Sequence, residues 1–138
     1  MTEETWTLVR YRLDRAREAL EEAVLLLESG HANTYVNRLY YACFHAVSAL
    51  LLAKELSSAR HSGVRALFHQ HIVKPGLISV SLGQMYDKLF DNRQKGDYAD
   101  LVRFAAQEVR PWLDEARAFI RDVEAVILRE GGPLQTEQ

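Results

Sequence analysis

The sequence contains little cysteine and proline and no long uncharged run, and each shortage excludes a class of protein. Its single cysteine, Cys43, cannot form an intrachain disulfide, so a packed core must hold the fold together. The longest uncharged stretch, residues 39–53, includes a histidine and is shorter than the ~18–20 residues of a membrane-spanning helix. The first ten residues include Glu3 and Glu4 and lack an apolar signal region. We therefore expect a cytoplasmic protein that does not associate with membranes.

An excess of basic residues is also missing. The chain has 17 Lys and Arg against 19 Asp and Glu, a net charge of −2, whereas nonspecific nucleic-acid binders usually carry a basic excess. This overall balance does not exclude a basic patch on one face of the protein. The length of 138 residues and the 48% of hydrophobic residues are typical of one globular domain that buries about two thirds of its surface. We expect a single helical domain over residues 1–130 and a disordered tail over residues 131–138.

The three prolines and seven glycines stand at a few places, which is typical of long helices separated by short breaks. Strand-favouring residues do not alternate with polar ones over a useful length, so we predict an all-α fold. The apolar periodicity predicts helices over residues 3–28, 34–55, 62–73, 78–90 and 97–129. A turn over residues 91–96 precedes Asp97 as helix N-cap, and Pro111 is expected to kink the last helix near Gln107. The architecture expected is an antiparallel up-down bundle of four main helices and one short helix.

The segment over residues 37–46 combines an apolar side with a cationic and aromatic side. At about 100° per residue, one side of this helix gathers apolar residues. They are Val36, Leu39, Tyr40, Cys43, Ala46, Val47 and Leu50. Arg38, Tyr41 and His45 share the other side, because offsets of 3, 4 and 7 residues return to the same face. One face therefore makes the core, and the second meets something polar.

This segment, together with residues 61–68 and 93–98, resembles the HEPN domain family, whose acronym stands for higher eukaryotes and prokaryotes nucleotide-binding. The three segments read Asn-Arg-Leu-Tyr-Tyr-Ala-Cys-Phe-His-Ala, His-Ser-Gly-Val-Arg-Ala-Leu-Phe and Arg-Gln-Lys-Gly-Asp-Tyr. The resemblance spans residues 8–127 and is closest to the small standalone prokaryotic branch. It implies a HEPN-like antiparallel helical bundle that forms a homodimer. It also implies a minimal nucleotidyltransferase as partner, in a two-gene module of the toxin–antitoxin kind.

The resemblance further implies an activity, because many HEPN domains are metal-independent ribonucleases with an Arg-x(4 to 6)-His motif at a dimer interface. Arg38 and His45 have six residues between them and fit this spacing. In such a site the arginine clamps the phosphate, and the histidine moves the 2′-hydroxyl proton. The motif is expected near the start of the last helix, where residues 93–98 carry Asp97 instead of a histidine. Because an ordinary aspartate has too low a pKa for this role, the nuclease hypothesis depends on His45.

Two hypotheses, which can also hold together, remain open for the polar side chains. In the first they bind RNA or a nucleotide through its phosphate, and the candidate binding residues are Arg38, Tyr41, His45, Arg93, Asp97 and Tyr98. In the second, Arg38, Tyr41 and His45 bond to the corner at residues 97–98 and pin two helices together. We expect no metal site and no cofactor, because His69 and His71 are two residues apart and point about 200° away from each other.

The function expected is that of a HEPN-like binding module with a nucleotidyltransferase partner and a site for RNA or nucleotide phosphate. The first alternative is a metal-independent endoribonuclease that uses Arg38 and His45. The second alternative is a structural homodimer without catalytic activity.

Overall fold

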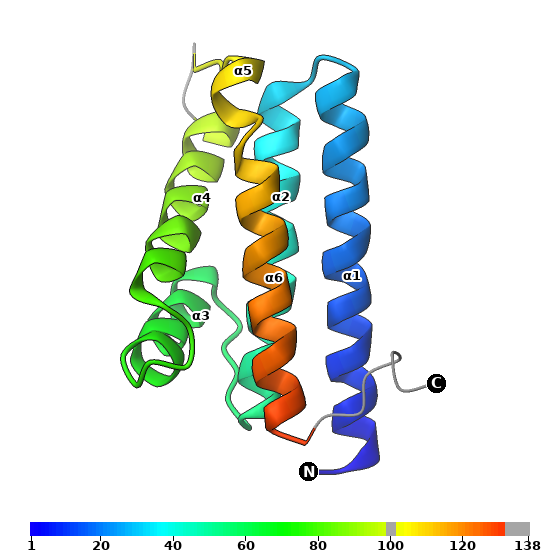
Figure 1. Cartoon of the computed structure of the whole chain (residues 1–138), viewed down its shortest axis with the longest axis vertical. Helices are drawn as coiled ribbons and strands as arrows, with labels where there is room; N and C mark the ends of the chain where they lie inside the picture. Colours follow the sequence, from blue (N-terminus) through cyan, green and yellow to red (C-terminus); the bar gives the residue numbers. More distant parts are fainter. Residues whose placement is uncertain (99–101, 132–138) are drawn as a thin grey trace.

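The described part of the chain has an all-α fold, as predicted. A computed structural model describes residues 1–98 and 102–131, and of residues 94–98 the backbone only. Its helices are α1 (Glu3–Glu28), α2 (Ala32–Ala53), α3 (His61–Phe68), α4 (Val80–Tyr98), α5 (Ala106–Val109) and α6 (Trp112–Arg129). The four long helices, α1, α2, α4 and α6, run alternately up and down (Figure 1). The expected disordered tail lies, from residue 132 onward, outside the described residues.

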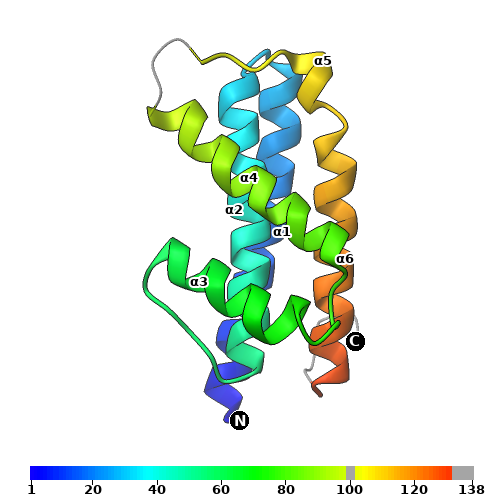
Figure 2. The same cartoon turned by 90° about the vertical axis from the view of Figure 1, so that its left-hand side faces the viewer.

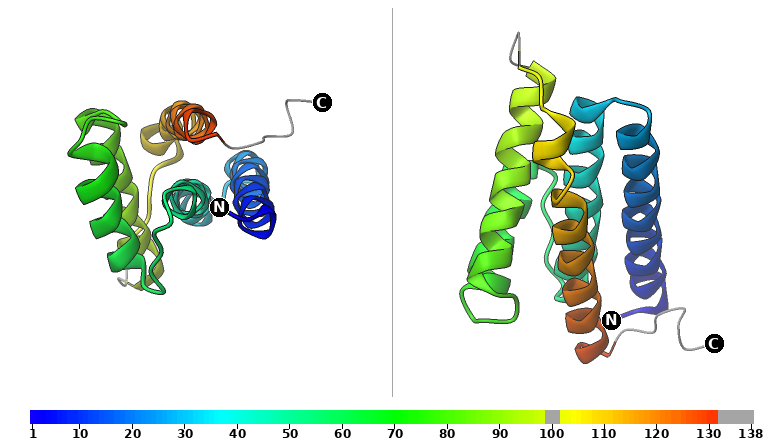
Figure 3. Two further views of the ribbon diagram at one scale, coloured as in Figure 1. Left: turned by 90° about the horizontal axis from the view of Figure 1, so that it is seen from below. Right: turned by 45° about the horizontal axis from the view of Figure 1, so that its top comes forward.

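Helix α2 is the centre of the bundle and contacts α1, α3, α4, α5 and α6. Seen along the long axis, α3 and α4 lie on the opposite side of α2 from α1 (Figure 3). Every residue of the predicted apolar side of α2 is buried, including Cys43, whose thiol pKa is raised by burial. Burial on several sides explains why this helix has almost no charged residues. Among the described helices, none is both long and apolar enough to cross a membrane.

Helix α1 has the bounds that the sequence predicts. The Thr2 side chain caps its first turn by accepting a hydrogen bond of 3.1 Å from the backbone N–H of Thr5. Its end is followed by Gly30 at φ +83°, in the left-handed conformation that favours glycine. This turn reverses the chain, so that α1 and α2 pack side by side along most of their length (Figure 1).

The turn predicted over residues 91–96 is wrong, because α4 continues through it to Tyr98. The local sequence favours a turn, but Tyr86, Leu89 and Arg93 lie at helical spacing and are all buried. Burial of this face outweighs the weak helix propensity of the segment. Asn92 is accommodated because its side-chain amide donates a hydrogen bond of 2.8 Å to the carbonyl oxygen of Lys88. Asp97 therefore lies inside α4 and does not cap the last helix.

The single last helix predicted over residues 97–129 is also wrong. Residues 102–105 are not helical, α5 is a single turn, and α6 starts only after Pro111. Proline at the entrance to a helix removes no helical hydrogen bond, so a break there is more favourable than a kink. Asn33 holds the non-helical segment with its side-chain amide, which donates a hydrogen bond to Val102 O and accepts one from Phe104 N, at 2.9 Å each.

The helix predicted over residues 62–73 has two parts. Helix α3 starts at His61, and its continuation His69–Val73 is a π-helical turn. This turn packs closely on α4, because a Cβ atom added at Gly83 would lie 3.1 Å from Val73 and 3.2 Å from His69. Helix α4 then crosses α2 obliquely (Figure 2), and the π-helical turn lies next to its start. Helices α3 and α4 bring His61 and Arg93 to the polar side of α2.

Candidate functional site

Arg38, Tyr41 and His45 follow one another along one face of α2. The Arg38 guanidinium lies 5.0 Å from the centre of the Tyr41 ring, in a cation–π contact. The Tyr41 and His45 ring centres are 6.1 Å apart. The three side chains are all partly exposed, so this face is accessible to solvent along two turns of the helix.

Arg38 is held from the side of α1. Its Nη1 donates to a carboxylate oxygen of Glu22 at 3.1 Å. Its Nε and Nη2 donate to Oδ1 of Asn37 at 3.2 and 3.0 Å. The guanidinium therefore pins α2 to α1. The expected contacts of Arg38 with Asp97 and Tyr98 concern side chains outside the described residues.

Arg93 of α4 approaches the same face from the opposite side. Its guanidinium lies 4.9 Å from the Tyr40 ring centre and 5.9 Å from that of Tyr41. Tyr41 is thus placed between the guanidinium groups of Arg38 and Arg93. Arg93 is only 7% exposed, which is uncommon for an arginine and shows that its side chain belongs to the packing of α4 on α2.

His61 of α3 also packs against α2 next to these side chains, and this position was not predicted from the sequence. Its ring stacks on Phe44 at 4.2 Å with an angle of 7° between the planes. Its Nδ1 is hydrogen-bonded to the Tyr40 hydroxyl at 2.7 Å. Burial, followed by the charge of Arg93, lowers the pKa of His61. Helical spacing does not relate His61 to α2, because α2 and α3 meet only through the tertiary fold.

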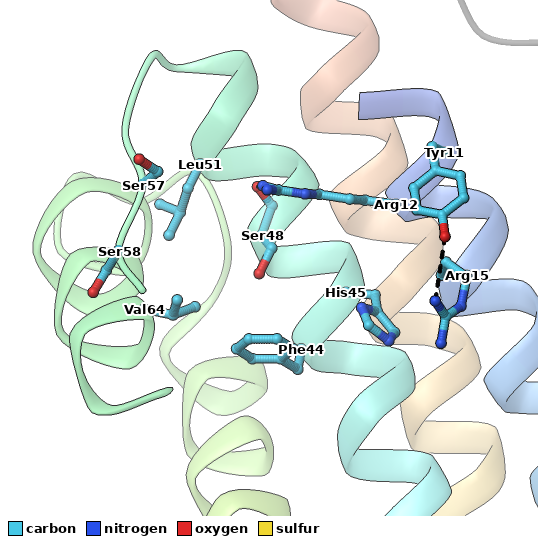
Figure 4. Close-up of a pocket in the computed structure, with 10 residues that line it drawn as sticks. All are labelled: Tyr11, Arg12, Arg15, Phe44, His45, Ser48, Leu51, Ser57, Ser58 and Val64. Atoms are coloured by element: carbon cyan, nitrogen blue, oxygen red, sulfur yellow. Dashed lines mark hydrogen bonds between the residues drawn. The ribbon is translucent and has the colours of Figure 1, made fainter. Parts of the chain in front are cut away.

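His45 opens onto a cavity of about 270 Å³ between α1, α2 and the start of α3. Arg12 and Arg15 of α1 line the same cavity. Figure 4 shows the His45 ring between α2 and Arg15, with Arg12 extended toward Ser48. Spacing alone signals that Arg12 and Arg15 are neighbours, but nothing in the sequence indicates that they face His45 rather than solvent.

The surroundings of His45 oppose its protonation. Burial, and then the charges of Arg15, Arg38 and Arg12, lower its pKa to about 4. The imidazole is therefore neutral near neutral pH. The neutral ring can accept a proton or a hydrogen bond. It cannot serve as a general acid near neutral pH, because almost none of it is protonated.

No group of three His, Cys, Asp or Glu side chains suited to a metal ion occurs within residues 1–93 and 102–131. His69 does have an acidic neighbour, since its Nε2 lies 2.9 Å from Oδ1 of Asp87. Arg65 lies 3.8 Å from the same carboxylate, so Asp87 takes part in a small ionic network between α3 and α4.

Comparison with known proteins identifies the family of this chain. A model of the HEPN domain matches residues 9–126, which is most of the chain. The chain belongs to the HEPN domain family.

Several known proteins are similar to this chain over most of their length. A UPF0332 protein of Thermotoga maritima is 44% identical over 120 residues, which cover 87% of this chain and 91% of the relative. A Methanocaldococcus jannaschii protein named "Putative toxin MJ0605" is 32% identical over 117 residues, covering 85% and 81% of the two chains. A second protein of that organism, "Putative toxin MJ0142", is 28% identical over 116 residues, covering 84% and 79%.

Arg38 and His45, whose spacing fits the expected motif, have different surroundings. The two side chains lie on one face of α2 but meet different neighbours. The guanidinium of Arg38 is turned to Glu22, and the ring of His45 faces Arg12 and Arg15. The cationic groups that share a cavity with His45 are therefore those of α1.

Proposed function

We propose that this chain is the HEPN component of a two-gene module of the toxin–antitoxin kind, with a minimal nucleotidyltransferase as its partner. Membership of the HEPN family supports this proposal, as do two relatives that are named as putative toxins and match most of both chains. The partner follows from the resemblance to standalone prokaryotic HEPN proteins.

The test is co-expression with the product of the neighbouring gene, which we expect to be a minimal nucleotidyltransferase, followed by size-exclusion chromatography. We expect the two chains to elute together as one complex. Separate elution at micromolar concentrations of both chains would contradict the pairing. A matched control is an unrelated nucleotidyltransferase of similar size, which should elute alone.

We further propose that the polar face of α2 binds RNA or a nucleotide through its phosphate. The observation that carries this proposal is the cavity next to His45, which Arg12 and Arg15 line and where burial and then the arginine charges keep the ring neutral. Such a positively charged surface, next to a neutral imidazole, favours an anion. Arg38, Tyr41 and Arg93 continue the cationic and aromatic character along the face, which suits phosphates and bases.

A metal-independent endoribonuclease is the second candidate. Its candidate general base is His45, whose neutral ring can take the proton from a 2′-hydroxyl, although a pKa of about 4 makes this ring a weaker base than an ordinary histidine. In this candidate Arg38 must leave Glu22 to hold the phosphate. Purified protein in the presence of a chelator should cleave RNA, and His45→Ala should abolish cleavage with little change in melting temperature. A His45→Ala variant that unfolds would instead support a structural role for the ring.

We also propose that the chain forms a homodimer, whether or not it is catalytic. Leu25 on α1 is 64% exposed and lies, with Leu20 and Val24, in an apolar depression. Arg17, Glu21 and Arg117 at its rim provide both signs of charge, as a self-complementary contact requires. Light scattering should show a dimer that Leu25→Arg disrupts. Leu128→Arg, at a 46% exposed position outside this depression, is the matched control and should leave the dimer intact.

A further inference from the structure

The cavity next to His45 is lined by cationic and hydroxyl side chains that the packing of the helices does not require. Its polar lining consists of Arg12, Arg15, His45 and the three serines Ser48, Ser57 and Ser58, together with the hydroxyl of Tyr11. Among the residues that the structure describes, no Asp or Glu lines it. Cationic donors and hydroxyls without a carboxylate among them are the side chains that bind phosphate oxygens.

The two arginines are positioned but keep donors for a ligand. Arg12 donates one N–H to the carbonyl oxygen of Ser48 at 3.3 Å, and Arg15 donates to the Tyr11 hydroxyl at 3.4 Å. Glu18 lies 3.4 Å from Nε of Arg15, on α1 and outside the cavity lining. Since a guanidinium carries five N–H donors, these contacts orient each group without using all of them.

The opposite wall of the cavity is apolar and is formed by Phe44, Leu51 and Val64 (Figure 4). A volume of about 270 Å³ is slightly below the range of roughly 300–1,000 Å³ for sites of drug-sized ligands. The space therefore suits one phosphate with one adjoining ring, and a longer ligand has to continue outside it.

We infer that this cavity binds a phosphate ester of ribose. Arg12 and Arg15 contact the phosphate, and the apolar wall contacts the ribose ring. This inference rests on the proposed binding of RNA or nucleotide phosphate and names the site and the ligand class. His45 and the serine hydroxyls complete the set of phosphate contacts. The ribose phosphate has two sources, a free nucleotide and the phosphorylated end of an RNA strand.

The experiment is isothermal titration of the full chain with three probes: adenosine 5′-monophosphate, a 5′-phosphorylated RNA decamer and the same decamer without the phosphate. Arg15→Gln is the main variant, because this side chain is exposed and its loss should not disturb the core. Arg12→Gln is the second variant, with its melting temperature measured because Arg12 also bridges α1 and α2. Arg121→Gln removes the same charge at an exposed position of α6 and is the matched control.

We expect the two phosphorylated probes to bind and the unphosphorylated decamer to bind much more weakly. Arg15→Gln should weaken binding roughly tenfold to a hundredfold, as expected for one charge-assisted hydrogen bond, and Arg121→Gln should not. The tighter of the two phosphorylated probes identifies the source. Binding of both decamers that Arg15→Gln and Arg12→Gln leave unchanged would overturn the cavity while leaving RNA binding itself in place. Absence of binding by every probe at millimolar concentration would overturn the cavity and the phosphate proposal together, and the nucleotidyltransferase pairing would stand on its own test.

Discussion

The Tyr40 hydroxyl and the His61 ring are hydrogen-bonded at 2.7 Å across the junction of α2 and α3. The same histidine ring stacks on Phe44, one turn further along α2. Tyr40 is completely buried, and burial raises its pKa to about 12, so the phenol stays protonated. These contacts attach the start of α3 to the centre of the bundle and fix one wall of the polar face.

Tyr40→Phe should lower the free energy of unfolding by about 1 kcal/mol, because it removes one hydrogen bond and leaves the ring packing in place. Urea denaturation measures this change. His61→Phe is the complementary variant, since it keeps a ring that can stack on Phe44. In the double variant, the loss in free energy of unfolding should be smaller than the sum of the two single losses. A loss equal to that sum would show that the hydrogen bond contributes nothing.

Protonation of His45 should make stability depend on pH. Its pKa is about 4 in the folded chain, below the ordinary value of 6.5. Between these two values the unfolded chain binds a proton that the folded chain does not, so stability falls as the pH falls from 6.5 to 4. His45→Gln removes this term, and its stability relative to the native chain should improve by up to about 2 kcal/mol between pH 7.5 and pH 5.

Thermal or urea denaturation of both proteins across this pH range provides the measurement. His61, whose pKa is also lowered, acts in the same direction and is present in both proteins, so the difference between them isolates His45. A difference that does not change with pH would mean that the His45 ring titrates normally in the folded chain.

Arg93→Ala should destabilise the fold by about 2 kcal/mol or more, since it removes the cation–π contact with Tyr40 and the packing of the buried side-chain stem. Arg93→Lys keeps the charge and part of the stem and should cost less. Arg121→Ala, on the exposed surface of α6, is the control and should change stability by less than about 0.5 kcal/mol. Equal effects of Arg93→Ala and Arg121→Ala would refute the structural role of Arg93.

Gly63→Ala should be destabilising by about 1 kcal/mol, because the new Cβ would lie 3.0 Å from the Cβ of Ser58 and closer still to its hydroxyl. Ser58→Gly removes that obstacle. In the Ser58→Gly background, Gly63→Ala should change sign and stabilise the chain by about 0.5–1 kcal/mol, because alanine is the better helix former. Destabilisation in both backgrounds would place the obstacle elsewhere.

The apolar periodicity of the sequence was enough to predict the fold class, the bounds of α1 and the buried side of α2. It failed where tertiary packing opposes local preference. Residues 91–96 favour a turn, yet α4 continues because Arg93 lies on the tyrosines of α2. Residues 102–105 lie in a predicted helix, yet the side chain of Asn33, far away in the sequence, holds them in another conformation.

The candidate site shows the same division. The spacing of Arg38, Tyr41 and His45 on one helix could be derived from the sequence, because it depends only on helix geometry. The neighbours of each side chain could not, because Arg12, Arg15, His61 and Arg93 come from three other helices. Which carboxylate faces Arg38 and which guanidinium faces His45 depend on how these helices pack.

The burial of Cys43 gives the chain a reporter that needs no added label. A thiol-specific reagent reaches this sulfur only when α2 separates from its neighbours, so the rate of alkylation under native conditions measures how often the bundle opens. Cys43 stands two residues before His45 on the same helix. A molecule that binds in the cavity next to His45 should stabilise the folded form and therefore slow this modification. At a given concentration, a tighter ligand should slow it more.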